Sequence, residues 1–259
     1  MTDPGAPVME ARVAMADPFR ERPGAVRRAA AGAWHVLAGF WYLLRSPSLW
    51  PVASLPAILA VVCLMGGLMF GYLTIPALER ALVPHAKVSE GVGFALVLVL
   101  AVGALGAGLV LGLAVALLLS APLLELLSRK VDARVRGQAV DRSRGFRWEM
   151  AQSFRGTLYF LAAAPGVFLL TLIPIVGPPL AILWGSYALA FQQTDAALSR
   201  RGLDFAARRE WHRYWKLESL GFGFAGLVCL IVPFANFLIA PALTVGGTLL
   251  VLELEDQLI

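Results

Sequence analysis

The chain has 259 residues, of which 59% are hydrophobic and 15% charged, with a formal net charge of +5 at pH 7 and a mean hydropathy of +0.73. Soluble domains have about 45–50% apolar and about 25% charged residues, so this composition excludes an ordinary soluble domain and indicates an integral membrane protein. Four windows hold no charged residue, and each exceeds the roughly 20 residues of a spanning helix: residues 46–78, 91–124, 156–194 and 219–252.

The first 23 residues differ in composition from the rest of the chain. Residues 1–23 mix small residues and prolines with charged side chains, and they hold no uncharged apolar core ahead of a cleavage site. This pattern predicts a polar tail, not a signal peptide. We expect residues 24–259 to form a single membrane domain.

Residues 24–45 have the spacing of an amphipathic helix. One face carries apolar side chains, at Val26, Ala30, Trp34, Leu37, Trp41 and Leu44. The opposite face carries Arg28, Gly32, His35, Gly39 and Tyr42. Basic and aromatic residues on such a helix suit the headgroup region of a bilayer. We therefore expect this helix to lie on the membrane without crossing it.

Two long apolar segments follow, and each predicts a full crossing of the membrane. Residues 49–75 begin with prolines that a first helical turn tolerates, and Pro76 is expected to end this span. Residues 91–121 carry no charge. Both segments contain glycines at GxxxG spacing: Gly67 and Gly71, and Gly108 and Gly112. For these glycines we favour generic helix packing over a specific dimer contact.

The third and fourth windows contain helix breakers at their centres. The breakers of the third window are Pro174, Gly177, Pro178 and Pro179, which leave arms at residues 158–172 and 180–194. The fourth window has the break PFAN at residues 233–236, with arms at 220–232 and 237–252. An arm of about 15 residues rises roughly 22 Å, which is less than the ~30 Å hydrocarbon core. Both windows are therefore expected to form helical hairpins that penetrate only half of the membrane.

The charges between the windows predict the topology. Residues 128–155 hold eight Lys or Arg and residues 195–218 hold six, whereas residues 76–90 hold only Arg80 and Lys87. Positively charged segments stay in the cytoplasm. Both hairpins should then enter and leave on the cytoplasmic side, the N terminus should be cytoplasmic, and the short 76–90 segment should lie outside.

The hairpin turns are the first candidate anion sites. A half-helix that begins inside the membrane exposes amide donors and the positive end of its dipole, which favour anions. The two turns hold Gly177 and Asn236. For Asn236 a structural N-cap is favoured over a role in a solute path, and Gln192 fits a polar path and an interfacial position equally well.

Other classes of function find little support. The GFGFAG segment at residues 221–226 matches GxGxxG but lacks the preceding strand of a dinucleotide site. No motif for catalysis, a metal ion or a cofactor stands out, so we expect none. The arginine runs lie beside four aromatic residues that favour lipid-facing loops over nucleic-acid binding: Trp148, Trp211, Tyr214 and Trp215.

Five segments between residues 34 and 252 carry a family resemblance. They are SPSLWPVASLPAIL, APLLELLSRKVDARVRG, IPIVGP, QQTDAALSRRGLDF and LGFGFAGLVCLIVPFANFLIAPALTVGGTLL. In this order they resemble the CysZ-type sulfate permease family, which shares a domain with etoposide-induced membrane proteins. The resemblance implies bacterial inner-membrane proteins with an interfacial helix, two crossings and two half-penetrating hairpins. It also implies homo-oligomers that carry sulfate inward.

Two motifs of that family differ in this chain. Where the family has Gly-Leu-Arg, with an arginine proposed to bind sulfate, the chain has Ser48, Leu49 and Trp50. Where the family has Asp-Tyr-Pro, the chain has Asp195 followed by two alanines. Arg45 is the nearest substitute for the missing arginine, although an interfacial anchor is its favoured role.

These expectations combine into one functional hypothesis. The chain is predicted to be an all-α channel or permease for sulfate or a related inorganic anion, embedded in the lipid bilayer as a homo-oligomer. Its pathway residues are expected to be Arg45, Ser48, Leu49, Gly177, Gln192 and Asn236. The alternative is a non-transporting membrane scaffold of the same fold.

Overall fold

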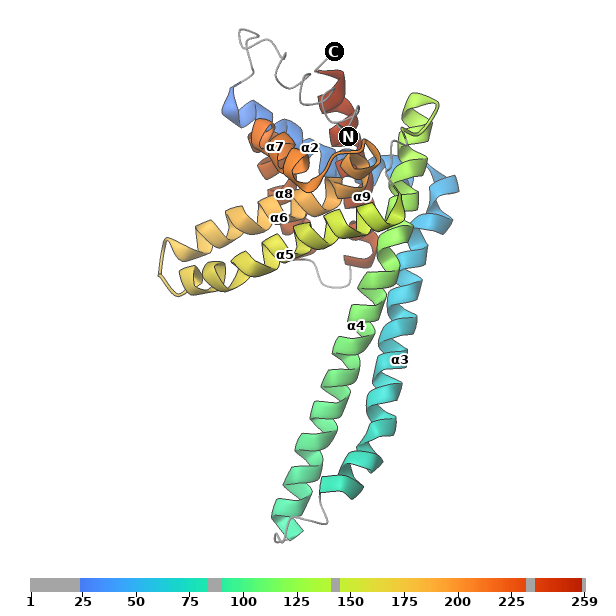
Figure 1. Cartoon of the computed structure of the whole chain (residues 1–259), viewed down its shortest axis with the longest axis vertical. Helices are drawn as coiled ribbons and strands as arrows, with labels where there is room; N and C mark the ends of the chain where they lie inside the picture. Colours follow the sequence, from blue (N-terminus) through green and yellow to red (C-terminus); the bar gives the residue numbers. More distant parts are fainter. Residues whose placement is uncertain (1–23, 83–89, 141–144, 232–235, 258–259) are drawn as a thin grey trace. The chain divides into compact units, whose positions relative to one another are not determined.

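The computed structural model describes residues 24–82, 90–140, 145–231 and 236–257. The predicted tail at 1–23 lies outside these residues. The described chain is all-helical, which confirms the predicted class (Figure 1). Its elements are α2 (Ala25–Leu44), the 3₁₀ helix η1 (Pro47–Leu49), α3 (Trp50–Leu82), α4 (Glu90–Arg136), α5 (Phe146–Thr171), α6 (Gly177–Arg200), α7 (Phe205–Tyr214), α8 (Lys216–Leu230) and α9 (Asn236–Asp256).

These helices fall into two compact units, and each is described by itself. Residues 52–124 form one unit, made of most of α3 and most of α4. The other unit combines residues 1–51 with residues 125–259 and therefore contains α2, η1, the last turns of α4 and all later helices. A single membrane domain over residues 24–259 stays a prediction.

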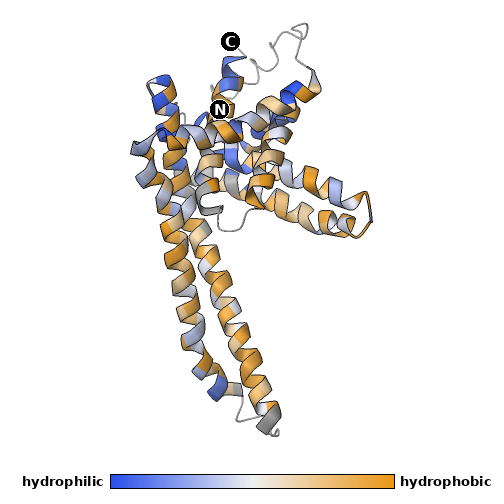
Figure 2. Ribbon diagram, turned by 180° about the vertical axis from the view of Figure 1, so that it is seen from behind, coloured by the Kyte–Doolittle hydropathy of each residue, from blue (hydrophilic) through white to orange (hydrophobic). Residues whose placement is uncertain are grey.

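The α3–α4 unit is a hairpin of two long apolar helices (Figures 1 and 2). Pro76 does not end the first helix, which continues to Leu82, so that predicted boundary is wrong. Pro122 likewise lies inside α4, which continues to Arg136. A proline removes a single intrahelical hydrogen bond, and apolar residues on both sides let the helix resume.

The GxxxG glycines of the two helices face each other inside this hairpin. A methyl group added at Gly67 would collide with the carbonyl oxygen of Gly108, and one added at Gly112 would collide with that of Cys63. Gly71 makes the same close approach to Ala104. The glycines therefore serve helix packing within one chain, as the generic interpretation predicts.

Two adjacent glycines of α3 allow a matched test of this packing. Gly67→Ala should lower the thermal midpoint, because overpacking costs about 1–3 kcal/mol. Gly66→Ala should leave the midpoint unchanged or raise it, since nothing lies within 4 Å of its added methyl group and alanine favours helix. Thermal unfolding in mild detergent measures both, and equal midpoints for the two variants would contradict the packing role of Gly67.

The core of the other unit lies where α2, α6, α8 and α9 pack together. Its fully or almost fully buried side chains include Val36, Ala190, Leu198, Phe222, Leu243, Leu250 and Val251. The GFGFAG segment lies at its centre, on α8. Gly221 touches the backbone of α2 at Ala29, and Gly223 touches that of α6 at Ser186. The repeated glycines thus allow close helix packing on two sides.

Helix α2 turns its less apolar face toward the protein. Gly32, His35, Val36 and Gly39 are buried against α8 and α9. Arg28 donates to both carboxylate oxygens of Glu218 at 2.6 and 3.0 Å. The apolar face predicted from the sequence is exposed, with Val26, Trp34, Leu37, Trp41 and Leu44 pointing away from the protein. This arrangement suits the predicted contact with a membrane.

Helices α5 and α6 form the first predicted hairpin, but its arms are longer than expected. They contain 26 and 24 residues instead of about 15, because both helices continue into the charged flanks of the apolar window. Among the residues that the structure describes, three helical segments are long and apolar enough to cross a membrane, where the sequence predicted two: Pro47–Ala81, Val92–Arg136 and Phe154–Thr171. Helix length therefore does not by itself make α5 half-penetrating.

The tip of this hairpin is apolar and exposed. Leu172, Ile173, Ile175 and Val176 are all at least half exposed, and Ile175 reaches 88%. Ile175 also has a φ of 72°, a conformation that costs a β-branched residue energy. Gly177 closes the turn, because any side chain there would collide with the carbonyl oxygen of Leu170.

Candidate functional site

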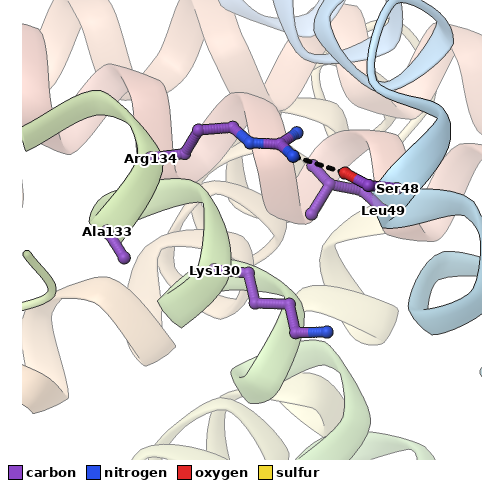
Figure 3. A pocket seen from close by; sticks show the side chains of 5 residues that line it. All are labelled: Ser48, Leu49, Lys130, Ala133 and Arg134. Atoms are coloured by element: carbon purple, nitrogen blue, oxygen red, sulfur yellow. Dashed lines mark hydrogen bonds between the residues drawn. The ribbon is translucent and has the colours of Figure 1, made fainter. Parts of the chain in front are cut away.

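A pocket of about 400 Å³ opens beside η1 (Figure 3). Two of its lining residues, Ser48 and Leu49, come from η1, and three come from the last turns of α4: Lys130, Ala133 and Arg134. Ser48 and Leu49 stand where the family that the sequence resembles has the first two residues of its Gly-Leu-Arg motif. The pocket therefore joins two sequence segments more than 80 residues apart.

Local structure explains how these side chains converge. Pro47 starts η1, and Leu49 is only 2% exposed, which fixes the short helix against the protein. Lys130 and Arg134 are four residues apart and so lie on one face of α4. Val131 and Asp132 lie between them and are fully buried. The end of α4 thus has a basic face at the pocket and a buried face behind it.

The electrostatics of the pocket favour an anion. The Arg134 guanidinium donates to the Ser48 hydroxyl, and both Lys130 and Arg134 are exposed to solvent. The five lining residues contain two cations and a hydroxyl but no carboxylate. Charge-assisted donors of this kind bind oxyanions more strongly than neutral donors do. The arrangement can hold a small oxyanion.

A buried ion network fixes the other face of α4. The Asp132 carboxylate is fully buried and lies 3.8 Å from Arg200 and 3.6 Å from Arg201, both at the end of α6. Arg201 also donates to both oxygens of Glu255 on α9, at 2.5 and 2.7 Å. Arg136 pairs with the same Glu255 at 2.8 Å. The network ties the ends of α4, α6 and α9 together behind the pocket.

Several basic residues that were expected in a solvated loop are instead buried. Residues 195–218 are largely helical, and Arg200, Arg201 and Arg208 are each almost completely buried in ion pairs. Trp211 and Trp215, expected to anchor the loop in lipid, belong to the apolar core. Local composition could not reveal this, because burial depends on acids such as Asp132 and Glu255 from distant helices.

His212 joins three helices at the centre of this region. Its Nε2 lies 3.0 Å from the Thr194 hydroxyl of α6, and its Nδ1 lies 2.9 Å from the Ser219 hydroxyl of α8. The Thr194 hydroxyl donates to the carbonyl oxygen of Ala190, so it accepts from Nε2–H of the imidazole. Complete burial lowers the pKa of His212 to about 3, so the ring is neutral at pH 7.

The other predicted pathway residues do not line the pocket. Arg45 is exposed and stacks on Trp41, with its guanidinium carbon 4.7 Å from the ring centroid. Gly177 closes the α5–α6 turn, and Gln192 is exposed on α6. Helix α9 begins at Asn236, but the side chain of Asn236 and the PFAN break lie outside what the structure describes.

Sequence reasoning missed Lys130 and Arg134. Both lie in LLELLSRKVDARVRG, a segment whose sequence indicates a family resemblance and a positive charge but no binding site. Their spacing of four residues placed them on one helix face, but nothing local pointed to Ser48. Only the packing of η1 against the end of α4 brings them to the pocket.

Comparison with known proteins gives a consistent family. A family model described as sulfate transporter CysZ/etoposide-induced protein 2.4 matches residues 35–241. A sulfate transporter CysZ of Pseudomonas fluorescens strain Pf-5 is 33% identical over 144 residues, which cover 51% of this chain and 57% of that protein. One from Pseudomonas aeruginosa strain PAO1 is 30% identical over 155 residues, which cover 55% of this chain and 62% of the relative.

The aligned region is only part of each relative. The chain spans a little over half the length of the curated relatives it matches. The family match is longer and covers well over half of the chain, including the η1 pocket, the basic end of α4 and most of the later helices. The chain, a multi-pass membrane protein, belongs to the sulfate transporter CysZ/etoposide-induced protein 2.4 family, which is a family of transporters and not of enzymes.

Proposed function

We propose that this protein carries sulfate or a related oxyanion across the bacterial inner membrane, and that the η1 pocket contacts the anion. The observation that carries the proposal is the pair of cations, Lys130 and Arg134, beside Ser48 and Leu49. Trp50 follows in the place where the family motif has its arginine. Two cations from α4 supply the positive charge that this substitution removes.

The proposed topology follows the sequence expectations. Both hairpins enter the membrane from the cytoplasmic side, penetrate it in part and return, and the N terminus is cytoplasmic. The exposed apolar tip of the α5–α6 hairpin supports this, because Ile173 and Ile175 would be unfavourable in water. The exposed basic residues of α7 and its neighbourhood, Arg213 and Lys216, support the cytoplasmic side for the opposite end.

Two single cysteines test this topology in a variant that lacks Cys63 and Cys229. Glu210→Cys on α7 should react with a membrane-impermeant thiol reagent only from the cytoplasmic side. Glu79→Cys near the end of α3 should react only from outside, and both side chains are exposed. Reaction of Glu210→Cys from outside would show that the chain crosses the membrane between the two basic segments.

We also propose that several copies of the chain associate. A single hairpin of α3 and α4 exposes apolar side chains along most of its length, and lipid or further copies must cover them. Mass measurement in mild detergent and in lipid checks this. A scaffold protein could also form oligomers, so association does not decide the function.

Measurement of anion flux decides between a transporter and a membrane scaffold. The purified chain in liposomes should take up radiolabelled sulfate faster than empty liposomes do, and excess sulfite should compete more strongly than excess chloride, because the pocket offers two cations to a doubly charged oxyanion. Uptake equal to that of empty liposomes, for protein that is folded by its thermal midpoint, would favour the membrane scaffold.

A further inference from the structure

A half-exposed aromatic surface lies where α5, α6 and α7 meet. Tyr159 of α5 and Trp184 of α6 have ring centroids 6.0 Å apart, and Tyr187 follows 6.1 Å from Trp184. All three rings are partly exposed. The Arg209 guanidinium of α7 lies 5.7 Å from the centroid of Tyr159. Three helices thus bring polar-tipped aromatic rings and a cation to one place.

Helix α7 carries three arginines, of which Arg208 is buried and Arg209 and Arg213 are partly or fully exposed. Arg208 is almost completely buried and donates to Asp195 and to the carbonyl oxygen of Leu203. Arg209 and Arg213 are four residues apart, and both are close enough to act electrostatically on the Tyr187 hydroxyl. Arg213 has an exposed partner, Glu210, at 3.2 Å, and such surface pairs contribute little.

Exposed apolar side chains lie on the same two helices, α5 and α6. Leu158 and Leu161 of α5 and Leu180 and Leu183 of α6 are each about half exposed. The hairpin formed by these two helices is apolar toward its tip (Figure 2). Aromatic rings with polar tips concentrate at the boundary between hydrocarbon and headgroups, and arginine there attracts anionic lipid.

We infer that Arg209 and Arg213, with Tyr159, Trp184 and Tyr187, bind the headgroup of an anionic phospholipid. We call these five residues the α7 lipid site. The phosphate lies between the two guanidiniums, which offer charge-assisted donors, and the acyl chains follow the exposed leucines of α5 and α6. A free inorganic anion would use the cations but gain nothing from the apolar surface beside them, so the combination favours a lipid.

Thermal protection by added lipid tests the site on the full chain in a non-ionic detergent. A ligand that binds only the folded state raises the midpoint, by about 5 °C for a protein of this size at roughly 100 times its dissociation constant. Phosphatidylglycerol should produce such a shift, and phosphatidylcholine at the same concentration should produce less than half of it. Equal shifts from the two lipids would overturn the proposal.

Variants of the two arginines test whether the phosphatidylglycerol shift arises at the α7 lipid site. Arg209→Gln/Arg213→Gln should lose most of the phosphatidylglycerol shift, and Arg209→Lys/Arg213→Lys should keep a good part of it because the charge remains. Arg27→Gln/Arg80→Gln removes two exposed charges elsewhere and should keep the full shift. If the first pair fails to fold, Arg213→Gln alone, whose side chain is 68% exposed, should lose part of the shift.

Two results would contradict a lipid site at these residues. One is a phosphatidylglycerol shift that stays unchanged in Arg209→Gln/Arg213→Gln, or that falls equally in the control Arg27→Gln/Arg80→Gln. The other is protection by sodium sulfate or glycerol phosphate that equals the lipid shift and disappears in the same variant, which would make this an inorganic anion site. Lipid binding is measured without transport, so either result leaves the sulfate pocket untouched.

Discussion

Replacing Lys130 and Arg134 with glutamine should nearly abolish sulfate uptake while the protein stays folded. Each cation supplies charge-assisted hydrogen bonds worth about 1.5–3 kcal/mol, so each single variant should weaken sulfate binding by roughly 10–100-fold. Both side chains are exposed, so their loss should change the thermal midpoint little. Uptake of radiolabelled sulfate well below saturation, normalised to folded protein, measures the effect.

Control variants separate the pocket from general loss of charge. Arg80→Gln removes an exposed charge from α3, outside the pocket, and should keep normal uptake. Arg134→Lys should keep part of the uptake, because it keeps the charge but loses the guanidinium fork. Normal uptake in the Lys130→Gln/Arg134→Gln variant would remove the pocket from the proposed pathway.

Arg45 has a distinct expected outcome in the same assay. If it is an interfacial anchor stacked on Trp41, Arg45→Gln should leave sulfate uptake per folded protein unchanged. A loss as large as that of Lys130→Gln would instead make Arg45 the substitute for the missing family arginine.

Removing the buried carboxylate of Asp132 should destabilise the protein more than any surface change. Asp132→Leu leaves Arg200 and Arg201 without the charge that lies 3.6–3.8 Å away from them. Removing one partner of a buried ion pair costs about 3–5 kcal/mol, because it leaves a desolvated charge uncompensated. The thermal midpoint in mild detergent should therefore fall by several degrees or the variant should fail to fold.

Two further variants make this prediction specific. Asp256→Leu removes a carboxylate that is 68% exposed and pairs with Arg136, so it should cost only about 0–1 kcal/mol. Asp132→Leu/Arg200→Met removes both buried charges, while Arg201 keeps its bonds to Glu255, and should be more stable than Asp132→Leu alone. Equal midpoints for Asp132→Leu and Asp256→Leu would show that the buried pairs contribute no more than surface pairs.

The amino-acid sequence by itself determined the membrane class, the all-helical structure and the break in the α5–α6 hairpin. These properties depend on local composition and on helix breakers, which act over a few residues. The faces of α2 follow from its helical spacing in the same way. Helix ends were harder to predict. Helix α3 continues through Pro76, and α5 and α6 extend beyond the apolar window into its charged flanks.

Only the tertiary structure decided which charged residues meet. Arg134 and Ser48 are 86 residues apart in the chain, and Arg200 and Ser128 are 72 apart, so no local pattern connects them. Counting charges placed Arg200, Arg201 and Arg208 in solvent. Carboxylates from distant helices allow the burial of Arg200 and Arg201, and Asp195 of the preceding helix allows that of Arg208. The pocket cations Lys130 and Arg134 belong to the basic segment at residues 128–155, and the buried cations belong to the equally basic segment at residues 195–218. Helix packing alone separates them, since it determines which side chains lose contact with water.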